Sequence, residues 1–179
     1  PDVVIVATGS VPCTPDIPGI NQGNVVTAWD LLAGKVKVGE KVVVAGGGMV
    51  GCETSEYLAE MGKNVVIVEM LNDIAMDMPT RTKLYLIHRF AKHGDLIRIL
   101  TGVKIDEISE AGLTLIDKNW ERKTLEADTI VLAIGSTSNR ELAEALKGEV
   151  PQLYMVGDCV RPRKISEAIN EGSRIARRI

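Results

Sequence analysis

The stretch KVVVAGGGMVGCETSEYLAEMGKNVVIVE, residues 41–69, decides the fold of this chain. Residues 41–45 are dominated by valine, which is typical of a buried strand, and residues 65–69 repeat the pattern. Between them, residues 49–61 have helical spacing, with one expected apolar side made of Val50, Thr54, Tyr57, Leu58 and Met61. Gly62 can end this helix because glycine accepts a positive φ. Strand, helix and strand in so short a stretch predict a βαβ unit with parallel strands.

Patterns on both sides of this unit predict an α/β chain. Further apolar strands are expected at residues 2–7, 129–134 and 153–156, and helices at 27–32, 80–93 (capped by Thr80), 140–146 and 165–179. Three short alternating runs, at 104–108, 113–117 and 122–125, predict an antiparallel three-stranded meander. We therefore expect a Rossmann-like, three-layer ββα domain that combines a parallel sheet with this meander.

The composition argues against several classes of function. The 179 residues carry a net charge of -3 and include only two Trp, three Tyr and one Phe, so nucleic acid is not expected as the main partner. No apolar run reaches the roughly 18 residues of a membrane span, so no membrane segment is expected. No secretion leader is visible, which favours a cytoplasmic protein. The start at Pro1, directly before a strand, predicts a piece of a longer protein.

The cysteines and histidines form no recognisable reactive group. Cys13, Cys52 and Cys159 contain no C-x-x-C pair, so neither a disulfide framework nor a redox disulfide is expected. His88 and His93 are five positions apart on one expected helix, which is not the i, i+4 spacing of zinc ligands. We therefore predict no metal site and assign no catalytic residue.

The glycines at 46, 48 and 51 form a G-x-G-x-x-G pattern between a strand and a helix, which is the context of a dinucleotide-binding turn. Gly46 would allow the tight turn, Gly48 would let a pyrophosphate approach the backbone, and Gly51 would let the helix pack closely on the strand. The N-terminus of the helix would present free N–H groups and partial positive charge to the phosphates. The pattern alone does not distinguish NAD from FAD.

Glu69 ends the second strand, 23 positions after Gly46, where an acid that binds the adenosine ribose is expected. Its carboxylate can accept hydrogen bonds from both ribose hydroxyls and would repel a 2′-phosphate. No Lys or Arg lies between Met70 and Thr80, and Asp73 and Asp77 add negative charge. These residues favour NAD(H) over NADP(H).

Three further strands end in glycine, which lets a ligand or a backbone come close. These ends are Thr8-Gly9, Ala133-Ile134-Gly135 and Gly157-Asp158. Their order along the chain resembles the pyridine nucleotide–disulfide oxidoreductase type of flavoprotein, in which an NAD(P)-binding domain is inserted into an FAD-binding domain. The matching motifs are VIVATG at 4–9, GGGMVGCE at 46–53, VLAIG at 131–135 with Asn139, and YMVGD at 154–158.

A closer resemblance is to the C-terminal part of 2-enoate reductase and related NADH:flavin oxidoreductases of the old yellow enzyme type. It rests on GDCVRPRKI at 157–165, EAI at 167–169 and LYLIHR at 84–89. The resemblance implies a separate barrel with FMN and an iron–sulfur cluster, in which an unsaturated substrate is reduced. The FAD Gly-rich motif is absent from this chain, and Ser136-Thr137-Ser138 replaces a segment that contains proline in most members.

The resemblance implies three parts: residues 1–23 and 150–179 as pieces of an incomplete FAD domain, and 24–149 as the NAD(H)-binding domain. The candidate NAD residues are Gly46, Gly47, Gly48, Met49, Val50, Gly51, Glu53, Glu69, Met70, Ala133, Ile134 and Gly135, and the candidate FAD residues are Thr8, Gly9, Gly157 and Asp158. Glu53 would either stabilise the helix dipole or approach the nicotinamide.

The expected function is hydride delivery from NADH to FAD, for the reduction of an enoate-type substrate in a barrel that this chain lacks. We expect this fragment alone to be inactive, with the remaining FAD and barrel portions of the same polypeptide as its partners. Two alternatives remain open. One is a module that binds ADP without turnover, as in related amine dehydrogenases, and the other is a relative of NADH oxidase or ferredoxin reductase.

Overall fold

The βαβ unit predicted at residues 41–69 is present as β4 (Lys41–Ala45), α2 (Met49–Glu60) and β5 (Asn64–Glu69). The computed structural model describes all residues, 1–179. The two strands pair in parallel, with Val43 opposite Val66. The βαβ unit in the structure therefore matches the bounds that the sequence pattern predicted to within one residue.

This unit is the centre of a five-stranded sheet with the order β3-β10-β4-β5-β6. The added strands are β3 (Val25–Thr27), β10 (Thr129–Leu132) and β6 (Ile97–Thr101). Every neighbouring pair in the sheet is parallel. Because both faces of a parallel sheet are covered, its inner strands are apolar throughout, as the valine run of β4 shows.

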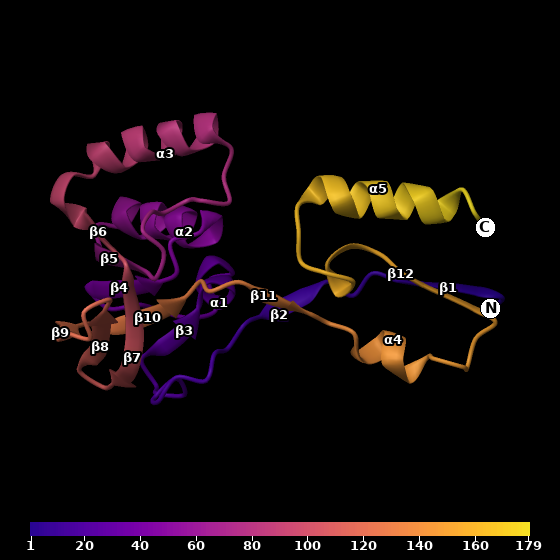
Figure 1. Cartoon of the computed structure of the whole chain (residues 1–179), viewed down its shortest axis with the longest axis horizontal. Coiled ribbons are helices and arrows are strands. Elements are labelled where there is room, and N and C mark those ends of the chain that lie inside the picture. The colour runs from indigo at the N-terminus through magenta and orange to yellow at the C-terminus, as the bar shows by residue number, and fades with distance from the viewer. The chain divides into compact units, whose positions relative to one another are not determined.

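The two faces of the sheet carry different layers (Figure 1). Alternate residues of a strand point to opposite faces, so Val42 and Val44 pack with α1 (Ala28–Leu32) and α2, while Val43 and Ala45 pack with the meander. A third helix, α3 (Thr80–Lys92), packs Leu86 beside α2. The expected order of helices, parallel sheet and meander is thus confirmed.

The meander consists of β7 (Val103–Ser109), β8 (Gly112–Asp117) and β9 (Arg122–Glu126) in antiparallel order. Leu113 lies opposite Ile108 on one side and Leu125 on the other, which gives the meander an apolar face toward the sheet. All three predicted strands are present.

The chain divides into two compact units. Unit 1 is Pro1–Cys13 with Gly135–Ile179, and unit 2 is Thr14–Ile134, which holds the five-stranded sheet. The boundaries predicted at 24 and 149 therefore differ from the division in the structure. Residues 14–23 belong with the sheet because Ile17 and Ile20 pack on its core, and Pro18 accepts a hydrogen bond from the Ile108 N–H at 2.8 Å.

Unit 1 contains two small pairs of strands. β1 (Val3–Val6) pairs in parallel with β12 (Gln152–Met155), and β2 (Ser10–Pro12) pairs antiparallel with β11 (Ser136–Ser138). Two α-helices, α4 (Glu141–Ala145) and α5 (Ile165–Ala176), and the short 3-10 turn η2 (Gly157–Cys159) complete it, while a similar turn, η1 (Gly94–Leu96), follows α3 in unit 2. Residues 135–149 belong here because β11 pairs with β2 and α4 buries Ala143 beside Val6.

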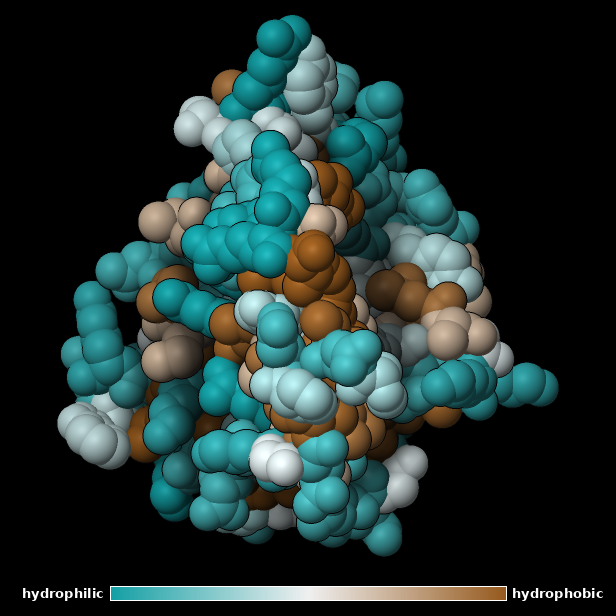
Figure 2. Space-filling model, turned by 90° about the vertical axis from the view of Figure 1, so that its right-hand side faces the viewer, coloured by the Kyte–Doolittle hydropathy of each residue, from teal (hydrophilic) through white to brown (hydrophobic).

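Helix α5 leaves much of its apolar surface uncovered. Ile165 and Ile169 are 79% and 64% exposed, and Ile175 is the one buried residue of the helix. Apolar side chains also show as brown patches on the face of Figure 2. Two strands are too few to cover a helix of three turns, so unit 1 alone has an incomplete core.

Two details of the helices differ from the prediction. The apolar side expected for α2 is correct at Thr54 and Leu58, which are fully buried, and wrong at Val50, Tyr57 and Met61, which are between 41% and 51% exposed. The N-cap of α3 is Pro79 rather than Thr80, which is the first helical residue, and no side chain caps this end. No helix of the chain combines the length and the apolar character needed to cross a membrane.

Candidate functional site

The glycine-rich turn lies where β4 ends, and two of its glycines are required by the backbone geometry. Gly46 has a φ of 105°, and a Cβ there would stand 2.5 Å from the carbonyl oxygen of Ala133. A Cβ on Gly51 would stand 1.9 Å from the carbonyl oxygen of Gly46. The tight turn and the close approach of helix to strand therefore both need glycine, as the pattern predicted.

Gly48 has a different environment. Its φ of -70° suits any residue, and the nearest atom to a Cβ there would be an Asp77 carboxylate oxygen at 3.5 Å. Gly48 is therefore not needed for folding, and its missing side chain leaves room beside the N-terminus of α2. By contrast, a Cβ on Gly47 would stand 2.8 Å from Ile74 Cγ2, so this position in the motif is constrained by packing, which the pattern did not indicate.

Glu69 is held against the turn by two backbone amides. Gly47 N donates to Oε2 at 2.7 Å and Leu71 N donates to Oε1 at 2.8 Å, and the residue is 9% exposed. No ion pair involves Glu69. Each carboxylate oxygen retains further acceptor capacity, so a fixed carboxylate is available at the end of β5.

A cavity of about 270 Å³ opens beside Glu69. Its lining includes Ala45, Gly46, Glu69, Met70, Ile105 and Ile134. Four of the predicted NAD residues, namely Gly46, Glu69, Met70 and Ile134, thus share one cavity at the carboxyl ends of parallel strands, where ligands of such sheets bind. The mostly apolar wall suits the base of a purine nucleoside and Glu69 suits the ribose, while Asp16 and Lys104 add one charge of each sign to the lining.

The other predicted NAD residues have different surroundings. Met49, Val50 and Glu53 lie in the first turns of α2 and do not line the cavity. Ala133 packs its backbone against Gly46, and Gly135 belongs to unit 1. None of these residues lines the cavity beside Glu69.

A second acid, Asp77, lies at the N-terminus of α2. Met49 N donates to its Oδ1 at 2.9 Å and to its Oδ2 at 3.1 Å. The sequence indicated Asp77 only as negative charge near Glu69 and gave no sign that its carboxylate reaches the glycine-rich turn. A segment without helix or strand carries it, so no periodic pattern fixed its position.

The residues predicted on the FAD side lie together within unit 1. Gly9, Gly157 and Asp158 line a cavity of about 380 Å³ with Arg163 and Lys164, and the neighbouring Thr8 donates to the Asn139 carbonyl at 2.7 Å. Asp158 accepts the Arg163 N–H at 3.1 Å.

Glu171 holds Arg163 and Gly157 in place at this cavity. Its carboxylate accepts hydrogen bonds from the Arg163 guanidinium and from Gly157 N. Both bonds lower the pKa of the Glu171 carboxyl below its ordinary value, and the bond from Arg163 has the larger effect. The lining therefore combines two cations, Arg163 and Lys164, with the acid Asp158, and Arg163 is already paired with Glu171.

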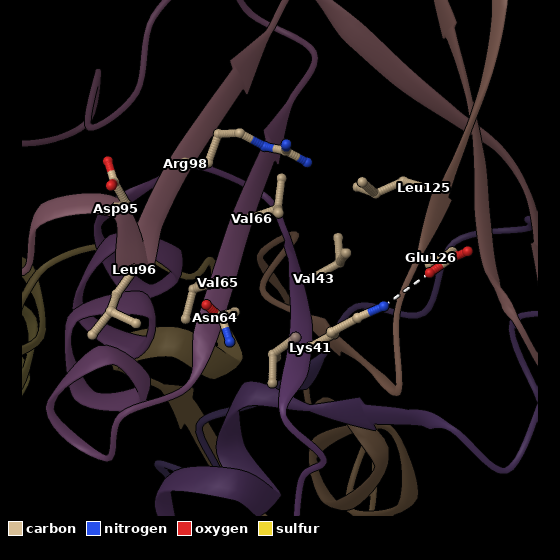
Figure 3. A pocket seen from close by; sticks show the side chains of 11 residues that line it. Lys41, Val43, Asn64, Val65, Val66, Asp95, Leu96, Arg98, Leu125 and Glu126 are labelled. Carbon is tan, nitrogen blue, oxygen red and sulfur yellow. Dashed lines mark hydrogen bonds and ion pairs between the residues drawn. The ribbon is translucent and has the colours of Figure 1, made fainter.

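A larger cavity, about 430 Å³, lies at the opposite ends of the strands of unit 2 (Figure 3). Lys41 and Glu126 form an ion pair there, with 2.9 Å between Nζ and Oε2, and Asn64 and Arg98 also line it. The amino ends of β4 and β5 form this hollow, which holds no part of the glycine-rich turn. Size alone therefore does not identify the nucleotide site.

The cysteines are not activated. Cys52 is fully buried, and burial raises the pKa of its thiol to about 12, so it stays protonated at neutral pH. Cys159 is buried and Cys13 half-buried, and all three are free.

The sequence analysis did not indicate one cluster of potential metal ligands. Possible ligand atoms of Glu56, Glu60 and His93 lie within 4.8 Å of one another. Arg89 already occupies both oxygens of Glu56, at 2.6 and 2.9 Å, so the contact joins α2 to α3 as an ion pair.

Comparison with known proteins agrees with this geometry. Residues 2–172 match the family described as pyridine nucleotide-disulphide oxidoreductase. An NADH oxidase of Thermoanaerobacter brockii is 43% identical over 98% of this chain and 28% of its own length, and a cinnamate reductase of Clostridium sporogenes is 35% identical over 99% and 26%. A structure of 2-naphthoyl-CoA reductase with 2-naphthoyl-CoA superposes with a TM-score of 0.93 and 37% identity, over 100% of this chain and 27% of that one. The chain thus spans little more than a quarter of these relatives.

Proposed function

Because the chain belongs to the pyridine nucleotide-disulphide oxidoreductase family, we propose that unit 2 binds NADH within a flavin-dependent oxidoreductase. The whole protein would pass the hydride to FAD and reduce an unsaturated, enoate-type substrate. The observation that carries the proposal is the Glu69 carboxylate, fixed by two amides beside the glycine-rich turn and at the wall of an apolar cavity.

The residues of unit 2 fit the adenosine and pyrophosphate half of the dinucleotide. Glu69 would accept hydrogen bonds from the ribose hydroxyls, and the space beside Gly48 would admit the pyrophosphate at the N-terminus of α2. The same carboxylate, with no cation paired to it, would repel a 2′-phosphate, which supports NADH over NADPH. When bound, NADH supplies the hydride and FAD accepts it, so the protein contributes binding, orientation and proximity.

The substrate class and the rest of the protein are part of the proposal. The name of the cinnamate reductase relative and the resemblance of residues 157–165 to 2-enoate reductase support an activated C=C bond as the group reduced. We further propose that FMN and an iron–sulfur cluster lie in a barrel elsewhere in the polypeptide. The uncovered face of α5 supports packing against more of an FAD domain. We also propose that the protein works in the cytoplasm.

A titration of the chain with NADH tests the binding site directly. Glu69→Gln removes the charge and keeps the shape, and we expect it to weaken binding by about 1–3 kcal/mol, the scale of a charge-assisted hydrogen bond. Glu126→Gln is the matched control, because this exposed acid lies by the other cavity and should leave the affinity unchanged. The melting temperature must be followed because Glu69 also holds the turn. Equal isotherms for the wild type and Glu69→Gln would show that Glu69 does not touch the ribose.

An ADP-binding module is the second candidate, since every contact described in unit 2 lies on the part of the ligand that ADP shares with NADH. The full-length protein separates the two functions. Anaerobic mixing with NADH should bleach the flavin absorbance if the protein is an NADH-dependent enzyme. Tight ADP binding without any bleaching would establish the module and refute the hydride transfer.

A further inference from the structure

The segment between β5 and α3, residues 70–79, is folded onto the glycine-rich turn. Ala75 N donates to the carbonyl oxygen of Gly47 at 2.6 Å, and Ile74 and Ala75 are 2% and 1% exposed. Ala75 has a φ of 52°, a left-handed conformation that is unfavourable for a residue with a Cβ. This strained backbone is held by burial and by the bond to Gly47, and it directs the chain toward α2 two residues later.

The carboxylate of Asp77 therefore reaches the Met49 amide, the first amide of α2, where it occupies the position that a bound anion would take. Both of its oxygens accept from Met49 N, and Oδ2 borders the space that Gly48 leaves open. The N-cap of α2 is Gly48, which has no side chain to satisfy these donors, so the carboxylate does so from a distant part of the chain. The Met49 amide that Asp77 occupies and the open space beside Gly48 are the two features that a pyrophosphate would use.

No cation neutralises Asp77. The nearby Lys83 forms its ion pair with Asp73, and no ion pair of the chain includes Asp77. Asp77 is itself exposed, whereas Ile74 and Ala75 are buried. The Asp77 side chain can therefore change its rotamer and point into solvent while Ile74 and Ala75 stay buried.

We propose that Asp77 is a built-in competitor of the dinucleotide pyrophosphate, which caps α2 in the free protein and must leave when the nucleotide binds. The inference rests on the proposed nucleotide site. If Asp77 competes in this way, it lowers the affinity for every ligand that places a pyrophosphate at this turn. It does not change the affinity for adenosine, which has no phosphate. Asp77 would thus weaken NADH and ADP binding equally.

The test is a titration of wild type, Asp77→Asn and Asp73→Asn chains with ADP and with adenosine at low ionic strength. Asp77→Asn removes the charge and keeps the shape, and we expect ADP to bind roughly three- to tenfold more tightly, an effect that salt reduces. Adenosine should bind all three chains equally. Asp73→Asn is the matched control, since its carboxylate bonds Lys83 and Ile74 N instead of the turn.

Unchanged or weaker ADP binding by a folded Asp77→Asn chain would overturn the inference while leaving the site intact. Absence of ADP binding by all three chains would instead refute the nucleotide site, and the inference with it. The wild type offers a second readout by NMR. The side-chain carboxyl carbon of Asp77 should shift on addition of ADP and stay in place on addition of adenosine, and a signal that ADP leaves unmoved would contradict the displacement.

Discussion

The three motif glycines have different reasons to be glycine. At Gly46 and Gly51 an added Cβ would overlap backbone oxygens, at 2.5 and 1.9 Å, so folding requires glycine. At Gly48 the backbone accepts any residue, so only a ligand would give glycine an advantage. Stability and binding can therefore be separated within one six-residue motif.

A pair of substitutions tests this separation. Gly48→Ala should leave the melting temperature within about 2 °C of wild type and weaken ADP binding roughly tenfold or more, because its Cβ enters the pyrophosphate space. Gly51→Ala should lower the free energy of unfolding by about 3 kcal/mol, since the helix must move away from the strand. Thermal melts followed by circular dichroism, together with ADP titrations, measure both. Equal losses of stability in the two variants would contradict the assignment.

For single residues, spacing in the sequence predicted the position of Glu69, which lies on a strand, and did not predict the position of Asp77, which lies on a loop. Glu69 ends a strand directly before the turn, so its position follows from the βαβ unit. Asp77 depends on the path of residues 70–79, which is set by the burial of Ile74 and the left-handed Ala75. Neither of these is visible as a period in the sequence.

At the scale of elements, α2 shows why its apolar side was predicted only in part. Thr54 and Leu58 are buried as predicted, and the rest of the buried side is made of the small residues Gly51, Cys52, Ser55 and Ala59. Small side chains are selected where a helix approaches a sheet closely, as the Gly51–Gly46 contact requires. The larger Val50, Tyr57 and Met61 are left on the outer side, so large apolar residues were a poor guide to the buried side of this helix.

The shortest strands were also beyond prediction. β2, β3 and β11 have three residues each, too few to show alternation, and β2 includes a proline. The meander was easier to predict because its strands are longer, with seven residues in β7, six in β8 and five in β9. The predicted boundaries differ from the two compact units for the same reason, since the pairing of β2 with β11 places residues 135–149 in unit 1.

The β8–β9 hairpin carries a residue that is strained by its backbone. Trp120 has a φ of 65° and is 82% exposed, in a turn where Asp117 Oδ1 accepts from Asn119 N and Glu121 N. Asparagine tolerates this conformation better, so Trp120→Asn should raise the free energy of unfolding by about 0.5–1 kcal/mol. Urea unfolding followed by circular dichroism measures it.

Lys118→Asn is the control for that substitution, because Lys118 lies in the same turn without a positive φ. It should change the stability by less than about 0.5 kcal/mol. A destabilised Trp120→Asn chain would mean that the indole makes a contact worth more than the backbone strain.

For the whole molecule, the two units differ in how complete they are. Unit 2 has a five-stranded sheet covered on both faces, and its residues alone form the cavity beside Glu69. Unit 1 has two strands under α5 and exposes Ile165 and Ile169. We therefore assign nucleotide binding to unit 2, while the chemistry proposed for the whole protein needs parts outside this chain.

The central claim is that unit 2 selects NADH through the fixed carboxylate of Glu69, and one measurement tests it most directly. Isothermal titration of the same chain with NADH and with NADPH compares two ligands that differ only in the 2′-phosphate. We predict that NADH binds at least roughly tenfold more tightly, because the phosphate would meet an unneutralised acid. Equal affinities, or a preference for NADPH, would contradict the account.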